Sequence, residues 1–345
     1  MEKILSLIIP TYNMEKYLNK CLDSLIVDNM DLVEVLVIND GSKDRSSEIA
    51  HEYEKKYPNT FRVIDKENGN YGSCINRGLK EATGKYIKVL DADDYFDTST
   101  FQEYINFLRE NDADLVLTDF CVVNELYKFQ KKITFSLLRN ESFTFDEYIK
   151  KYPFGVQMHA VTYRVKNLRK IDYVQTEGIS YTDQEWIHYP MTTVKTILYL
   201  PLTLYQYLMG REGQTADINI VKKNIGQQET CLYSMIRSLD NINNGIYYDY
   251  LMNRVLHTMS FIYSSYLFKF KDLDIKELLE FDNNINREYS LVYAISNNIV
   301  FSKLLPVKYV KVWRENNNMR LGIQYYYMYK LSCILNRLIY KLSKL

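Results

Sequence analysis

Short apolar runs alternate with helical patterns through the first 120 residues, and this alternation constrains the fold more than any other feature of the chain. The apolar runs at 5–9, 33–38, 61–64, 86–90 and 115–123 have the length and content of buried strands. Helical spacing separates them at 14–26, 49–57, 74–82 and 101–108, and Asn13 is the expected N-cap of the first helix. Strands that alternate with helices predict an α/β fold, with a mostly parallel sheet covered by helices on both faces.

The pattern becomes less regular between residues 124 and 212. It predicts a strand at 128–135, helices at 145–152 and 182–191, and two short strands, 194–200 and 202–207, on either side of Pro201. From about residue 218 the pattern is helical, rich in Tyr, Asn and Leu, and poor in Gly and Pro. We therefore expect two domains, an α/β domain over residues 1–215 and a helical domain over residues 216–345.

Composition excludes several classes of protein. Apolar residues make up 47% and charged residues 25%, values of a globular protein rather than a disordered or collagen-like one. Lys and Arg (43) balance Asp and Glu (43), so the basic charge of a dedicated nucleic-acid binder is absent. The five cysteines include no CxxC pair, which argues against a zinc cluster or disulfide framework and favours a reducing, cytosolic setting. The N-terminal apolar run is too short for a signal peptide, and no run of 18 uncharged apolar residues predicts a spanning helix.

Polar residues follow three of the predicted strands, at 10–13, 39–42 and 91–94. Ligands of open α/β sheets bind outside the carboxyl ends of the strands, so these clusters should share one crevice. Asp91, Asp93 and Asp94 repel one another, and holding them beside a buried strand is costly unless a cation compensates. Oxygen ligands of this kind suit Mg²⁺ or Mn²⁺. The simpler alternative is a solvated turn in which one aspartate caps the next helix.

Two common nucleotide motifs are missing from the sequence. No GxGxxG follows the first strand, and there is no Walker-A lysine loop. A dinucleotide-dependent dehydrogenase or a P-loop enzyme is therefore disfavoured. The remaining interpretation is a nucleoside diphosphate site that a metal completes.

Five motifs in order resemble those of family 2 glycosyltransferases: LIIPTYN (7–13), VINDGSKD (37–44), NGNYGSCINRGLKEATGKYIKVLDADD (68–94), TDQEW (182–186) and GREGQT (210–215). The resemblance covers about residues 4–215 and leaves out the last 130. It implies a GT-A fold and a metal-dependent reaction that inverts the anomeric centre.

The resemblance also implies roles for individual residues. Thr11 and Tyr12 would lie near the nucleobase, and Asp40 would accept a hydrogen bond from the base edge. Asp93 or Asp94 would bind the metal while the other contacts ribose, Asp183 would be the general base, and Arg211 would close over the diphosphate. The full nucleotide-sugar set is Pro10, Thr11, Tyr12, Asp40, Asn68, Gly72, Asp91, Ala92, Asp93 and Arg211.

Other interpretations of the base region remain open. Thr182 to Glu185 also resembles a helix capping box, which could hold together with a catalytic Asp183. Glu185 is the reserve candidate for the base, although a charge on a helix surface is the simpler interpretation. The four histidines (His51, His159, His188 and His257) are scattered, and we expect each to be a surface or core residue.

The sequence departs from the family pattern in three places. Asn39 replaces the first acid of the common DDGS, Thr182 replaces a frequent Glu before the base, and Ala160-Val161 replaces a polar Asn-Lys pair. Asp40 remains, so the first change looks tolerable. The second weakens any inference about how the surroundings tune Asp183, and the third weakens any transfer of acceptor contacts.

The reaction implied by the resemblance is transfer of a hexose or N-acetylhexosamine from a UDP-sugar to a hydroxyl group, with Mn²⁺ or Mg²⁺. The acceptor would be a glycan or glycoprotein. A nucleotidyltransferase is one alternative, but it usually has a Gly-rich basic loop after the first strand, unlike residues 10–13. A non-catalytic scaffold of the same fold is another, and the retained acidic residues and Arg211 argue against it.

The segment from residue 302 to 345 is strongly basic. It contains nine Lys or Arg residues and one acid, Glu315, and it is rich in Leu, Ile and Tyr. A basic, aromatic, helical segment is typical of a helix that lies on an anionic membrane surface. Packing on the acidic remainder of the chain, or contact with a second copy, is the alternative.

Overall fold

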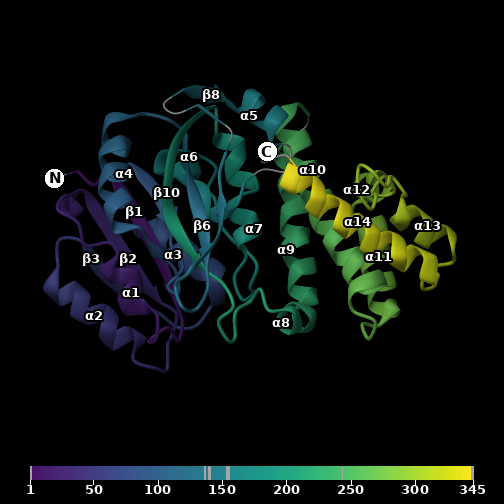
Figure 1. The fold of residues 1–345 in the computed structure, drawn as a ribbon, viewed down its shortest axis with the longest axis horizontal. Coiled ribbons are helices and arrows are strands. Elements are labelled where there is room, and N and C mark those ends of the chain that lie inside the picture. Colours follow the sequence, from purple (N-terminus) through teal and green to yellow (C-terminus); the bar gives the residue numbers. More distant parts are fainter. Residues whose placement is uncertain (1, 136, 139–140, 153–155, 243, 343–345) are drawn as a thin grey trace. The chain divides into compact units, whose positions relative to one another are not determined.

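The computed structural model describes residues 2–342 apart from 136, 139–140, 153–155 and 243 (Figure 1). The chain divides into two compact units. Unit 1 comprises Met1–Ile220 and Ile242–Leu251, and unit 2 comprises Val221–Asn241 and Met252–Leu345. In the described part of the chain, each helix is either too short or too polar to cross a lipid bilayer.

Unit 1 is built on a mixed sheet rather than a mostly parallel one, because β5, β7, β8 and β9 each pair antiparallel with a neighbour. The order β3-β2-β1-β4-β9-β6-β10-β5 places the first strand near the middle. β1 pairs in parallel with β2 and β4, whereas β9 lies antiparallel between β4 and β6. β7 pairs antiparallel with β6, and β8 pairs antiparallel with β10. The strands are β1 Leu5–Thr11, β2 Val33–Asn39, β3 Phe61–Asp65, β4 Tyr86–Val89, β5 Tyr95–Phe96, β6 Leu115–Val123, β7 Phe129–Ile133, β8 Ser142–Thr144, β9 Val161–Arg164 and β10 Thr196–Leu208.

Helices join the strands of unit 1 and confirm the α/β class that the alternating pattern predicts (Figure 1). α3 packs on β1 and β2, and α4 packs on β10. The approach of α3 to β1 is close, because a Cβ at Gly78 would lie 2.6 Å from the Ile8 side chain. The helices are α1 Leu18–Asp23, α2 Ser46–Lys56, α3 Asn70–Glu81, α4 Thr98–Glu110, α5 Phe145–Lys151, α6 Val165–Lys170 and α7 Asp183–Trp186.

The segment from residue 218 onward is helical, as its pattern predicts. α8 Ile218–Lys223 and α10 Ile246–Ser264 each run from unit 1 into unit 2. The remaining helices belong to unit 2: α9 Ile225–Arg237, α11 Ile275–Glu288, α12 Ser290–Ser296, α13 Tyr309–Glu315 and α14 Ile323–Leu342 (green to yellow in Figure 1).

Three local expectations are wrong. The first helix begins at Leu18 rather than after Asn13, because Asn13 adopts a left-handed φ of 53° in which its side chain accepts the Lys43 N–H. The expected helix at 182–191 is split into α7 and a 3₁₀ turn, Tyr189–Thr193. The two strands expected around Pro201 are one, β10, whose register against β6 shifts between Leu200 and Thr203 and so accommodates a residue without an N–H.

The strand register places the polar clusters together. β1 and β2 end level with each other, since Thr11 pairs with Asn39. β1 pairs with β4 at Ile8 and Val89, and continuing that register sets Asp91 level with Pro10. The carboxyl ends of β1, β2 and β4 therefore form one edge of the sheet.

Candidate active site

The loops after β1 and β2 are fixed to each other at this edge. The Asp40 N–H donates to the Thr11 carbonyl (2.8 Å), and the Lys43 N–H donates to Asn13 Oδ1 (2.8 Å). Between these anchors, the side chain of Tyr12 is 46% exposed. The edge thus presents one aromatic ring to solvent on a rigid backbone.

Asp40 and Asn68 form a polar group between the loops after β2 and β3. Asp40 is buried, and its Oδ1 accepts from Lys66 Nζ (2.5 Å) and the Gly69 N–H (3.0 Å). Asn68 Nδ2 donates to the Asp40 carbonyl oxygen (2.9 Å). These contacts fix the backbone directly before α3, so one Asp40 oxygen is already used within the chain.

Asp91, Asp93 and Asp94 follow β4, and each has a different partner. Tyr71, in the first turn of α3, donates through its hydroxyl to Asp91 Oδ1 (3.0 Å). Arg211 Nε forms an ion pair with Asp93. Asp94 is the most buried of the three, at 1% exposure. The α3 helix therefore links this acidic turn to the group around Asp40.

Both carboxylate oxygens of Asp94 accept hydrogen bonds from β10. The Tyr205 hydroxyl donates to Oδ2 (2.6 Å), and the Leu208 N–H donates to Oδ1 (2.7 Å). Tyr205 also accepts a hydrogen bond from the Asp91 N–H (3.2 Å). The long strand β10 thus holds the acidic turn in place.

Burial is the dominant electrostatic influence on this turn. Burial first and the neighbouring charge of Asp93 second raise the pKa of Asp91 to about 7, while the Tyr71 hydrogen bond opposes the shift. Burial and the charges of Asp93 and Asp91 also raise the pKa of Asp94 well above its usual range. A divalent cation bound nearby would stabilise the ionised form of these carboxylates and offset the cost of their burial and mutual repulsion. The donor set therefore fits a metal ion.

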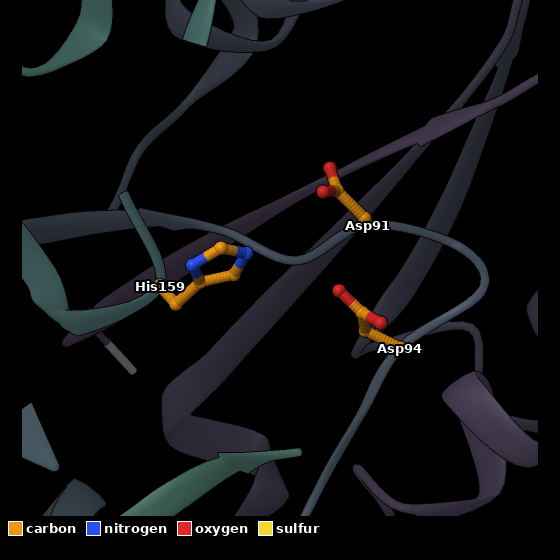
Figure 2. Close-up of side chains that lie close together, drawn as sticks. All are labelled: Asp91, Asp94 and His159. Carbon is orange, nitrogen blue, oxygen red and sulfur yellow. The ribbon is translucent and has the colours of Figure 1, made fainter. Parts of the chain in front are cut away.

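His159 joins Asp91 and Asp94, as Figure 2 shows, with its ring turned toward the two carboxylates. One ligand atom from each of the three residues lies within 4.8 Å of the others. Phe120 and Tyr207 pack against the imidazole, with centroid distances of 5.0 and 4.3 Å. Burial, with the nearby Lys88 charge, lowers the pKa of His159 to about 3. The ring is thus a neutral nitrogen donor, the form that binds metals.

The placement of His159 follows from a strand that the sequence pattern did not reveal. β9 pairs antiparallel with β4, with Tyr86 opposite Arg164 and Ile87 opposite Tyr163. His159 lies in the 3₁₀ turn Met158–Ala160 directly before β9, so this pairing brings the turn to the end of β4. The expectation of an ordinary core or surface histidine missed this position, because without β9 no pairing pattern connects residues 91 and 159.

Asp183 is the first residue of α7 and lies near the acidic turn. Its negative charge raises the pKa values of both Asp91 and the Tyr71 hydroxyl. Gln184 Nε2 donates to Asp183 Oδ2 (3.2 Å). The N-cap of α7 is Thr182, whose side chain makes no capping hydrogen bond, so the capping box that the sequence resembles is not formed. The side chain of Asp183 is only partly buried and can therefore meet a ligand.

Glu185 corrects the expectation of a surface charge. It is 4% exposed, and its two carboxylate oxygens accept from the Thr176 N–H (2.8 Å) and the Thr176 hydroxyl (2.7 Å). It does not close a capping box with Thr182. Its visible role is to anchor the segment around Thr176.

Arg211 lies in the loop after β10. Besides its pair with Asp93, its guanidinium lies over the Tyr17 ring, 5.7 Å from the centroid. Gly210 and Gly213 flank it with φ values of 102° and 74°, which other residues rarely adopt. The glycines allow the loop to turn back so that the cation reaches the acidic turn.

The remaining predicted residues have different surroundings. Thr11 is buried, and its hydroxyl donates to the Ile9 carbonyl (3.1 Å). Ala92 is buried, and Pro10 is half-buried. Gly72 faces Thr176, because a Cβ there would lie 2.0 Å from the Thr176 carbonyl oxygen. Gly72 therefore serves close packing of α3 against that segment.

The model of the family described as Glycosyl transferase family 2 matches residues 6–171. This segment contains β1 to β9 and the acidic turn. The match confirms the family resemblance that the five motifs indicate.

Curated relatives match over the same N-terminal region. An uncharacterized glycosyltransferase of Bacillus subtilis, EpsJ, is 39% identical over 116 residues, which is 34% of this chain and 33% of the relative. The poly(ribitol-phosphate) beta-glucosyltransferase of Bacillus spizizenii is 37% identical over 117 residues, 33% of this chain and 18% of the relative. The chain thus spans about a third of EpsJ and less of the second enzyme.

One solved structure resembles the chain over most of its length. The crystal structure of S. aureus TarS 1-349 in complex with UDP-GlcNAc has a TM-score of 0.64 at 21% identity, and the match covers 92% of this chain and 89% of the other. At this identity the likeness concerns the fold. It confirms the GT-A-like α/β architecture followed by a helical region.

Proposed function

Because residues 6–171 belong to glycosyl transferase family 2, we propose that the chain is an inverting glycosyltransferase. It moves a hexose or N-acetylhexosamine from a UDP-sugar to a hydroxyl of a glycan or glycoprotein acceptor. The observation that carries this proposal is the convergence of Asp91, Asp93, Asp183 and Arg211 at the carboxyl edge of the sheet. A GT-A domain over residues 1–215 performs the reaction, and residues 216–345 contact the acceptor, the membrane or a second copy.

The donor nucleotide occupies the loops after β1, β2 and β3. The exposed Tyr12 ring packs on the base beside Pro10 and Thr11, and Asp40 offers its second carboxylate oxygen to the base edge, since Oδ1 is already used. Asn68 and Gly72 hold the loop and the start of α3 beneath the nucleotide. A relative crystallised with UDP-GlcNAc supports a uridine nucleotide.

The acidic turn holds the metal and the diphosphate. We assign the ion, Mn²⁺ or Mg²⁺, to Asp93 and Asp94, as the family resemblance implies, with Asp91 and the backbone at Ala92 beside the donor. Ligand atoms of Asp91 and His159 lie within 4.8 Å of one of Asp94, so both side chains are close to this ion. When bound, such an ion offsets the negative charge of a diphosphate. As the donor enters, Arg211 exchanges its ion pair with Asp93 for a contact with the diphosphate. Its guanidinium group then stabilises the negative charge that develops on the leaving diphosphate.

Asp183 accepts the proton of the acceptor hydroxyl. A hydroxyl is a weak nucleophile and needs a base within about 2.6–3.2 Å in the productive complex. A single displacement forms the new bond to the anomeric carbon as the bond to the diphosphate breaks, which inverts that carbon. Partial exposure of Asp183 beside a buried acidic turn gives the acceptor access from solvent.

The test of this assignment is Asp183→Asn, with Asp172→Asn as a matched control. Asp172 is exposed and has a left-handed φ of 45°, which Asn tolerates well. Asp183→Asn should lower turnover by about 10²–10⁴-fold and leave UDP affinity nearly unchanged. Sugar transfer and UDP binding are measured on both variants with Mn²⁺. Turnover of Asp183→Asn equal to that of the control would remove Asp183 as the base.

We also propose that α14 attaches the enzyme to an anionic membrane surface. Five large apolar side chains on this helix are exposed, at the spacing of one helical face, and its sequence contains no Asp or Glu. Lys330 and Arg337 are exposed beside them. We place this surface on the cytoplasmic side, because the five widely spaced cysteines include no CxxC pair and so favour a reducing compartment. The apolar residues are Ile323, Tyr327, Leu331, Ile334 and Leu338.

Flotation with vesicles that contain anionic lipid tests this attachment. The full chain should float, whereas a chain ending at Asn316 and the variant Leu331→Ser/Ile334→Ser/Leu338→Ser should not. The matched control is Leu291→Ser/Leu304→Ser, which removes two exposed apolar side chains elsewhere in unit 2. Equal flotation of all four proteins would exclude the membrane role of α14.

A further inference from the structure

A hollow of about 590 Å³ lies at the end of β4 opposite to the candidate active site. Lys85 precedes the first residue of β4, and Asp91 follows its last, so the length of the strand separates the two places. The hollow lies wholly within unit 1. Its charged lining residues are Lys85, Arg164, Lys166, Arg169, Lys170 and Glu2, five basic groups against one acid.

The basic groups of the hollow are only partly neutralised. One exposed carboxylate, Asp112, pairs with both Lys85 and Arg164. Arg169 donates to backbone carbonyl groups, including that of Ala82 (2.5 Å), and not to an acid. In the part of the chain that the structure describes, neither Lys166 nor Lys170 lies within ion-pair distance of a carboxylate. Three cations therefore have no acidic partner.

The hollow is formed by segments that are distant in the sequence. The turn before β4 supplies Gly84, and a Cβ there would lie 2.7 Å from the Ser6 N, so the turn packs tightly on β1. The Gly84 N–H already donates to Ser6 Oγ (2.8 Å) and to Glu34 Oε1 (3.1 Å). An anion would thus meet side-chain cations, chiefly the ammonium groups of Lys166 and Lys170, because Arg169 Nη2 already donates to the Leu79 and Ala82 carbonyl oxygens.

A solvated basic surface is the simpler explanation of such a cluster. Two features go against it here. The cations surround a hollow, and Lys85 meets Arg164, at the end of β9, and the three α6 cations without an acidic partner only in the fold. We propose that this hollow binds a phosphoryl group of an anionic ligand, at a site distinct from the donor site. The hollow is open to solvent, so it can take a phosphoryl group that belongs to a larger molecule.

Calorimetric titration of inorganic pyrophosphate into the full chain, with EDTA present, tests the proposal. Lys166→Glu/Lys170→Glu removes two unpaired cations that lie four residues apart on α6, so they share a face. Lys55→Glu/Lys56→Glu changes the net charge equally at exposed positions of α2. The first variant should bind pyrophosphate at least 10-fold more weakly than the wild type, and the control should bind as the wild type does.

Three results would overturn the proposal: no pyrophosphate binding by the wild type, unchanged binding by the α6 variant, or equal loss in both variants. An unchanged melting midpoint shows that the α6 variant is folded. Retained sugar transfer shows that the donor site is intact, so the two proposals fail separately.

Two further titrations identify the source of the phosphoryl group. If a glycerol-phosphate oligomer loses affinity for the α6 variant while UDP does not, the ligand is a phosphodiester polymer. If the wild type has two classes of binding site for UDP and the α6 variant has only one, the ligand is a nucleotide. Loss of neither overturns the proposal, because pyrophosphate binding alone would then reflect an adventitious ion only.

Discussion

Asp91 shows how burial and repulsion prepare a carboxylate for a cation. Water is largely excluded around it, and Asp93 lies two residues away. The folded protein therefore holds a proton on Asp91 up to about pH 7, whereas the unfolded chain releases it near pH 4. Between these values the folded state binds more protons than the unfolded state, so this group makes stability fall as pH rises.

The first prediction concerns this pH dependence. Asp91 lies beside the site that we assign to the metal, and the charge of a bound ion disfavours a proton on Asp91, so Mn²⁺ should stabilise the protein more at pH 8 than at pH 5. At pH 8 and 100 times its Kd, the ion should add about 2.7 kcal/mol to the free energy of unfolding. Urea titration at both pH values, with and without Mn²⁺, measures this, and Asp91→Asn should weaken the difference. Equal stabilisation at both pH values would contradict the metal assignment.

The ion pair between Arg211 and Asp93 yields a second prediction. Arg211→Ala removes the cation that competes for Asp93, so Mn²⁺ should bind the nucleotide-free protein more tightly. Sugar transfer should nevertheless fall by about 10²-fold, because the leaving diphosphate loses a charge-assisted contact. Calorimetry and kcat report the two effects, and the exposed Arg287→Ala is the control. Weaker metal binding together with slower transfer would instead indicate a collapsed acidic turn.

At the scale of elements, the sequence predicts the strands and helices whose apolar residues repeat regularly. β1, β2, β6 and α3 are long enough for that pattern to appear. β9 has four residues, and its antiparallel partners lie far away in the sequence, so no local signal marks it. Because the sequence pattern does not predict β9, it does not place His159 beside the acidic turn. The aspartates are predicted there because they follow β4.

Tight packing of α3 on the segment around Thr176 gives a prediction at this scale. Gly72→Ala sets a methyl group against the Thr176 carbonyl oxygen and should lower the free energy of unfolding by about 1–3 kcal/mol. Gly226→Ala in α9 is the control, since nothing lies within 4 Å of its Cβ position and a helical Ala is favoured by up to about 1 kcal/mol. Denaturant titration compares them, and equal stability of the two variants would contradict the packing role.

At the scale of the whole molecule, each unit has its own buried interactions. In unit 2, Arg314 on α13 pairs with Asp282 on α11 (2.6 Å) and donates to Asn297 Oδ1 (2.8 Å). Its guanidinium also lies 3.7 Å from the Tyr293 ring centroid. Both charges of the pair are buried, so one residue connects α11, α12 and α13.

Breaking this connection should unfold one unit before the other. Arg314→Met leaves Asp282 buried without its partner, which costs about 3–5 kcal/mol. Calorimetry should show two transitions, of which only the one from unit 2 moves to lower temperature. Lys311→Met, which removes an exposed pair on the same helix, should change stability by less than about 1 kcal/mol. A uniform shift of the whole unfolding profile would mean that the units unfold together.

The antiparallel pairing of β4 and β9 fixes how far the chain before β9 extends along β4. β9 begins directly after the 3₁₀ turn that carries His159, so deleting one residue from 161–164 would pull that turn, and the imidazole with it, away from Asp91 and Asp94. It would also shift the Val161 carbonyl that holds the wholly buried Lys88 ammonium. Substitutions within β9 should therefore be tolerated more readily than insertions or deletions.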